Sequence, residues 1–244
     1  MAQTKSATLE LGSTCSFSTP NHILLRHHKR PIREGISMKL IDQPRAPNPR
    51  RVNIFLAEKG ITIPTEELNI PGKEHLTPEI KALNPVQTLP ILVLDDGTAI
   101  SESVAICRYF EELQPEPPLM GTTPLEKATV EMWQRRMEFN LMNNVAAVFR
   151  HSHPAMAELE VPQVADWAEA NRPRVQRALE MLDAQLATNQ YVAGDSYSIA
   201  DITALVGVDF TKMGRIEVPD TLANLARWRA EVSNRPSAKA GMSK

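Results

Sequence analysis

The part of the chain whose residue types could do chemistry is residues 84–106, NPVQTLPILVLDDGTAISESVAI. Pro90 precedes the apolar run Ile91–Leu94, and an Asp-Asp-Gly turn leads to a second short strand. The Ser-Glu-Ser sequence at 101–103 then begins an amphipathic helix. An extended segment can bind a peptide through main-chain hydrogen bonds, and a helix N-terminus offers amide donors to an anion. We therefore predict a binding site for a small anionic peptide.

The segments that must position this site follow the pattern of an α/β module. We predict strands over residues 39–43 and 66–70, and helices over residues 49–59 and 78–83. Asn48 is the predicted N-cap of the first helix, because a proline follows it at the first helical position. With the hairpin and the third helix, the order β-α-β-α-β-β-α predicts parallel and antiparallel pairing in one sheet.

Composition changes along the chain predict its division into domains. Residues 38–113 form the α/β module, residues 114–123 are a Pro-rich linker, and residues 124–244 carry helical patterns. Residues 1–37 are Ser/Thr-rich and basic with no sustained period, so we expect them to be disordered. Three interpretations stay open for this segment: a start assigned too early, a native extension, or a cleaved transit-like leader.

The overall composition is that of an ordinary globular protein. The 244 residues are 42% hydrophobic and 23% charged, with a net charge of −2, which gives no reason to expect nucleic-acid binding. No apolar run approaches the roughly 20 residues that cross a bilayer. The two cysteines, Cys15 and Cys107, form neither a disulfide framework nor a metal-ligand set, so we expect no metal and a reducing, cytoplasmic location.

Four segments together resemble the cytosolic glutathione transferases. They are PRAPNPRRVNIFLAEKGI at 44–61, NPVQTLPIL at 84–92, SESVAI at 101–106 and SIADI at 198–202. The resemblance implies a thioredoxin-like N-terminal domain with a mixed four-stranded sheet, followed by an all-α C-terminal helical bundle. It also implies glutathione as co-substrate, a small electrophile as second substrate, a detoxification role and a homodimer.

The resemblance assigns the first glutathione contacts. The main chain of Leu89, before a cis Pro90, pairs with the cysteinyl backbone of glutathione, and Glu102 and Ser103 bind its γ-glutamyl end. The helix N-terminus suits the carboxylate, and the Glu102 carboxylate suits the ammonium group. The simpler alternatives are a proline that only ends a strand, and plain capping with Ser101 as N-cap and Glu102 as a first-turn acid.

The glycine carboxylate of glutathione needs a cation or amide donors. Lys73 and His75 lie in the loop where the family often places such donors, although each could equally be a solvated surface side chain. Thr88 flanks the same pocket, where many members carry Gln or Lys, so a contact from Thr88 would be shorter and weaker.

The residue that activates the thiol is the open question. The position where many members carry Ser or Cys falls on Ala46, which can donate nothing to sulfur. The loop resembles that of a bacterial group with an asparagine, which corresponds to Asn48. Its side-chain amide could donate to the thiolate, or its oxygen could cap the following helix, and Arg45 and Arg50 could add positive potential.

We therefore predict an enzyme that binds glutathione, stabilises its thiolate and conjugates or reduces a small hydrophobic electrophile. Two alternatives remain: a glutathione-dependent disulfide or peroxide reductase, and a non-catalytic binding protein on the same fold. Elsewhere, Ser198 and Asp201 fit a capping box at a helix start, so we expect a folding role for them and no part in binding.

Overall fold

The computed structural model describes residues 38–242, and the predicted extension over residues 1–37 lies outside them. A four-stranded sheet has the order β2-β1-β3-β4, with β1 parallel to β2 and antiparallel to β3, and β3 antiparallel to β4. The strands are β1 (Lys39–Asp42), β2 (Thr65–Glu67), β3 (Ile91–Val93) and β4 (Ala99–Ser101). The predicted mixed sheet is confirmed.

The second strand ends earlier than the sequence predicted. β2 stops at Glu67, and the amide of Ile70 does not pair with a strand but donates to the Gln43 side chain at 2.9 Å. Gln43 lies directly after β1, so this bond joins the two loops that leave the sheet at the same end.

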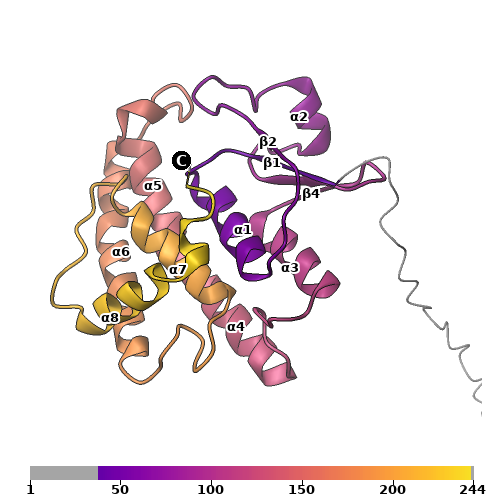
Figure 1. Cartoon of the computed structure of the whole chain (residues 1–244). Helices are drawn as coiled ribbons and strands as arrows, with labels where there is room; N and C mark the ends of the chain where they lie inside the picture. The colour runs from indigo at the N-terminus through magenta and orange to yellow at the C-terminus, as the bar shows by residue number, and fades with distance from the viewer. Residues whose placement is uncertain (1–37, 243–244) are drawn as a thin grey trace, which may run out of the picture. The chain divides into compact units, whose positions relative to one another are not determined.

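Helices cover both faces of the sheet, as Figure 1 shows. α1 (Pro47–Glu58) and α3 (Ser103–Leu113) pack against one face, where Leu40 and Leu92 point, and α2 (Pro78–Leu83) lies over the other. Neighbouring residues of one strand point to opposite faces, so Ile41 and Ile91 pack with Ile80 of α2. The alternation fixes which strand residues face which helices.

The second half of the described chain is helical. Its elements are α4 (Pro124–Arg136), a π-helical segment η1 (Met137–Met142), α5 (Asn143–Ser152), α6 (Ala165–Leu186), α7 (Ile199–Phe210) and α8 (Ala223–Ser233), with short 3-10 turns η2 (Pro154–Met156) and η3 (Pro236–Lys239). The π segment η1 therefore lies between α4 and α5, and α8 begins at Ala223. Within residues 38–242, no helix has the length and apolar character needed to cross a membrane.

One hydrophobic core runs through both halves. Phe55 of α1 and Cys107 and Phe110 of α3 belong to the same buried cluster as Trp133 of α4 and Leu205 of α7. Burial raises the pKa of the Cys107 thiol to about 12, so this cysteine is a small core residue, not a nucleophile.

Candidate functional site

The register of the sheet brings the predicted site segments to one end. Ile91 pairs with both Ile41 and Ser101, and Asp42 pairs with Glu67. The start of β3 and the ends of β1, β2 and β4 therefore share one sheet edge. The four loops that carry the predicted site residues leave the sheet at that edge.

The segment before β3 offers main-chain groups to a ligand. The Leu89–Pro90 peptide bond is cis, and among residues 38–242 neither the amide nor the carbonyl of Leu89 has a hydrogen-bond partner. The preceding residue, Thr88, is exposed, and its carbonyl and hydroxyl oxygens accept from the Asn84 amide at 2.9 and 3.2 Å. Asn84 is buried, so it holds this segment in place while Leu89 keeps its polar groups open.

The N-terminus of α3 differs from the simple cap that was one alternative. Ser101 belongs to β4, so it is not the N-cap, and Glu102 occupies that position with no side-chain capping bond. Glu102 has φ 69° and ψ 113°, a conformation that L residues rarely adopt and that costs of order 1–3 kcal/mol. Its side chain is exposed, whereas Ser103 is buried. The helix α3 thus begins directly after β4, at the sheet edge, with no side-chain cap on its first amides.

A buried arginine, which sequence reasoning missed, holds Ser103. Arg51 of α1 is fully buried, and its Nη1 donates to Ser103 Oγ at 3.0 Å and to Glu138 Oε1 at 2.8 Å. Glu138 lies in the π segment η1, so the chain Ser103–Arg51–Glu138 joins both halves of the protein. Its signal in the sequence was a charged residue on the same helix face as Ile54 and Phe55.

The N-terminus of α1 is also uncapped, which corrects the predicted role of Asn48 as N-cap. Ala46 takes that position and has no polar side chain, while Asn48 is the second helical residue and is exposed. Pro47 and Pro49 have no N–H, and the Arg50 amide donates to the Ala46 carbonyl at 3.0 Å. The Asn48 amide is therefore the one open N–H of the first turn within the described chain, beside the positive end of the helix.

Lys73 and His75 occupy different environments in the same loop. Lys73 is exposed and pairs with Glu158 at 3.0 Å, whereas His75 is buried, and burial lowers the pKa of its ring. The surface alternative therefore does not hold for His75. The Gln87 amide donates to the His75 carbonyl at 3.3 Å, which ties this loop to the segment before Pro90.

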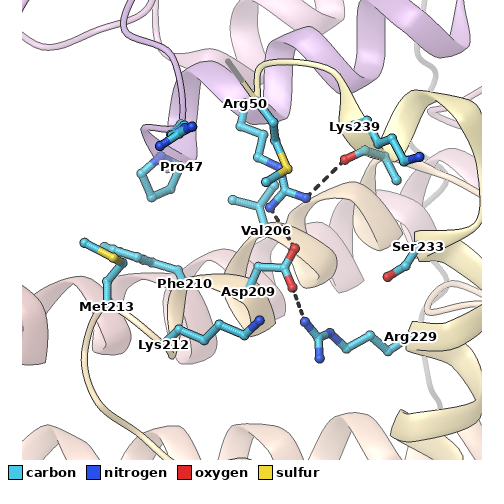
Figure 2. A pocket seen from close by; sticks show the side chains of 13 residues that line it. Pro47, Arg50, Val206, Asp209, Phe210, Lys212, Met213, Arg229, Ser233 and Lys239 are labelled. Carbon is cyan, nitrogen blue, oxygen red and sulfur yellow. Dashed lines mark hydrogen bonds and ion pairs between the residues drawn. The ribbon is translucent and has the colours of Figure 1, made fainter. Parts of the chain in front are cut away.

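A pocket of about 380 Å³ lies beside the N-terminus of α1. Figure 2 shows that its walls come from the first turn of α1, the end of α7, α8 and the C-terminal segment. Arg50, which could add positive potential here, is buried, and its Nη1 donates to Asp209 Oδ2 at 2.8 Å. The C-terminal segment is anchored here, since the Arg45 amide donates to the Gly241 carbonyl at 2.8 Å.

Known protein families match both halves of the chain. The family descriptions "Glutathione S-transferase, N-terminal domain" and "Glutathione S-transferase, C-terminal domain" match residues 46–113 and 142–236. Glutathione S-transferase 2 of Saccharomyces cerevisiae is 38% identical over 211 residues, which cover 84% of this chain and 91% of that protein.

Solved structures of glutathione S-transferases are also similar to this chain. The crystal structure of a glutathione S-transferase domain-containing protein from Marinobacter aquaeolei VT8 has a TM-score of 0.80 at 39% identity, covering 82% of this chain and 98% of that one. The crystal structure of Gtt2 from Saccharomyces cerevisiae has a TM-score of 0.79 at 37% identity, with the same coverage. The chain belongs to the glutathione S-transferase family.

Proposed function

We propose that this protein is a glutathione transferase whose glutathione lies along the sheet edge. The Leu89 main chain pairs with the cysteinyl backbone, Ser103 and the α3 amides bind the γ-glutamyl carboxylate, and Glu102 binds the ammonium group. The observation that carries the proposal is convergence: the unpaired Leu89 main chain and the uncapped N-termini of α1 and α3 leave the sheet at one edge. Such a set of open donors and acceptors suits a tripeptide with two charged ends.

The chemistry we propose requires a thiolate. A free cysteine thiol has a pKa near 8.5, so at neutral pH it is mostly protonated. The amide of Asn48, its side-chain NH₂ and the positive end of α1 all favour the negative sulfur, which lowers the pKa of the bound thiol. The thiolate then attacks an electrophilic carbon; a C–S bond forms, and the leaving group departs with the electron pair of the broken bond.

The second substrate lies in the pocket beside the first turn of α1. That pocket adjoins Pro47, the neighbour of Asn48, so an electrophile bound there faces the sulfur. We propose a homodimer in the cytoplasm as the working assembly, by analogy with the family. The active-site loop has no cysteine, so we favour conjugation over a reduction that passes through a mixed disulfide with the enzyme.

The test measures the ultraviolet absorbance of the glutathione thiolate in the complex against pH, together with glutathione affinity. We expect a bound thiol pKa below about 7.5 in the wild-type protein. Asn48→Ala removes only the side chain and raises that pKa, and Asn48→Asp raises it further because it places a carboxylate beside the thiolate. Lys81→Ala, an exposed change on α2, is the control.

The outcomes separate the competing functions. Glutathione binding without a thiolate signal below about pH 8 favours a non-catalytic binding protein. Turnover with disulfide or peroxide substrates alone, in an activity panel that includes conjugation substrates, favours the reductase. A protein that does not bind glutathione at all contradicts the proposal.

A further inference from the structure

The pocket beside α1 has an unusual charge. Five of the side chains that line it are basic and one is acidic, in a chain whose net charge is −2. The basic residues are Arg45, Arg50, Lys212, Arg229 and Lys239, and the acidic residue is Asp209. Building on the proposed function, we infer that the second substrate of this transferase carries an anionic group, a carboxylate or sulfonate, which these cations bind.

Among residues 38–242, the one carboxylate that lines the pocket is already paired. Asp209 Oδ2 accepts from Arg50 Nη1 at 2.8 Å, and its Oδ1 accepts from Arg229 Nη2, as the dashed lines of Figure 2 mark. Arg50 also donates to the Ala238 carbonyl at 3.2 Å. Asp209 therefore offsets one of its two guanidinium partners, and this trio keeps one positive charge.

Two donors of the paired arginines remain unused. The Nε atoms of Arg50 and Arg229 are buried and have no hydrogen-bond partner among the described residues. A buried N–H without an acceptor is costly, so the positive charge of these two arginines is only partly compensated by the protein.

The other three cations have no carboxylate partner in the part of the chain that the structure describes. Among residues 38–242, Arg45, Lys212 and Lys239 form no ion pair, and all three are exposed. Side chains of one sign that line a concave surface concentrate the field and raise the local concentration of the opposite charge. The pocket therefore attracts anions although the whole chain is slightly negative.

The remaining wall of the pocket is apolar and faces the proposed thiolate. In Figure 2, Pro47, Phe210 and Met213 lie together on one side, and Lys239 and Arg229 lie on the other. An apolar body can occupy the first side while an acidic group reaches the second. This arrangement refines the predicted hydrophobic electrophile into an amphipathic one, with its reactive carbon toward α1.

The test uses two electrophiles with the same aromatic ring, a chlorodinitrobenzoate, which carries a negative charge, and its methyl ester, which carries none, together with the glutathione conjugates prepared from each. We expect the wild-type protein to have a lower KM for the acid, and to bind the acid conjugate more tightly in calorimetry. In the double variant Lys212→Gln/Lys239→Gln the acid loses about five- to tenfold in both measurements, and the ester changes less than about twofold. Lys127→Gln, an exposed change on α4, is the matched control.

Each outcome is decisive. Equal binding of the two conjugates, or a loss of the same size for both in the double variant, overturns the inference and leaves the transferase function standing. Conjugates that bind in a charge-dependent manner support the inference even if neither electrophile is turned over. If neither conjugate nor glutathione binds, the proposed function fails together with this inference.

Discussion

The N-termini of α7 and α3 show how one structural feature serves two purposes. At α7, the Ser198 side chain caps the helix, and the Asp201 carboxylate accepts from the Ser198 amide. The predicted capping box is therefore present. At α3, Glu102 holds the N-cap position with a positive φ and makes no side-chain capping bond. The first helix end is satisfied by the protein, and the second leaves donors for another molecule.

An uncapped helix end is not enough to mark a site. α6 and α8 also begin without a side-chain cap. Neither helix follows a strand of the sheet, so their first residues do not lie at the sheet edge beside the open main chain of Leu89. What distinguishes α1 and α3 is that the sheet register places both beside the Leu89 main chain. The comparison therefore predicts that changes at α7 alter stability and that changes at α3 alter glutathione affinity.

Replacing Asp201 should have the largest effect. The carboxylate is fully buried and accepts from the Val192 amide at 2.9 Å, from Trp228 Nε1 at 2.8 Å and from the Ser198 amide at 3.0 Å. Asp201→Ala leaves these donors buried without partners, so we expect a loss of about 3 kcal/mol in the free energy of unfolding. Denaturant unfolding measures the loss, and calorimetry on the folded protein should give an unchanged glutathione affinity.

Asp195→Ala is the control for that change, because Asp195 lies nearby in sequence and is exposed. A loss of glutathione affinity in Asp201→Ala without loss of stability would contradict the purely structural role of α7's first turn.

The stability contributed by Asp201 should also depend on pH. Burial raises the pKa of this carboxyl from 3.8 to about 6, although four hydrogen bonds oppose the rise. The native state then holds the proton more tightly than the unfolded state, so this contribution is present below about pH 4 and is lost as the pH rises through 6. We expect the unfolding free energy of wild type relative to Asp201→Asn to fall by roughly 3 kcal/mol between about pH 4 and pH 7. A flat difference over this range would mean that the carboxyl is ionised throughout.

Exchanging serine for alanine at each helix end compares the two directly. Ser103→Ala removes the proposed hydroxyl contact to the γ-glutamyl carboxylate, and we expect the glutathione Kd to rise about tenfold. Arg51 keeps its bond to Glu138, so stability should change by less than about 1 kcal/mol. Ser198→Ala should do the reverse, with a loss of about 1 kcal/mol in stability and an unchanged Kd. If both variants only lose stability, Ser103 is another structural residue.

Local patterns made much of the fold predictable. Alternation of apolar residues, the Asp-Asp-Gly turn and the capping box at Ser198 each depend on neighbours in sequence, and each predicted element is present. The prediction of Asn48 as the N-cap of α1 was wrong, because Asn-Pro and Ala-Pro are both acceptable helix starts. The preceding loop decides between them, since the Ala46 amide donates to the Gln43 carbonyl.

Contacts between distant segments could not be predicted from the sequence. Arg51 and Glu138 are 87 residues apart, and Arg50 and Asp209 are 159 apart, so no local period records either pair. The same holds for the pocket, whose cations come from four separate segments. Sequence reasoning found the loop that carries the proposed glutathione contacts and missed the buried arginine that holds it.

The smallest predicted effect concerns Lys73, a candidate glutathione ligand that forms an ion pair with the helical half. Its Nζ lies 3.0 Å from a carboxylate oxygen of Glu158, and both side chains are exposed, so the pair itself should add little to stability. Lys73→Gln should raise the glutathione Kd about twofold if Lys73 reaches the glycine carboxylate. Glu158→Gln then has the opposite sign, because it releases Lys73 from its competitor and lowers the Kd slightly. Calorimetry at low salt resolves the two signs, and a shift of the same sign in both variants would place Lys73 outside the site, as a surface ion pair between the two regions.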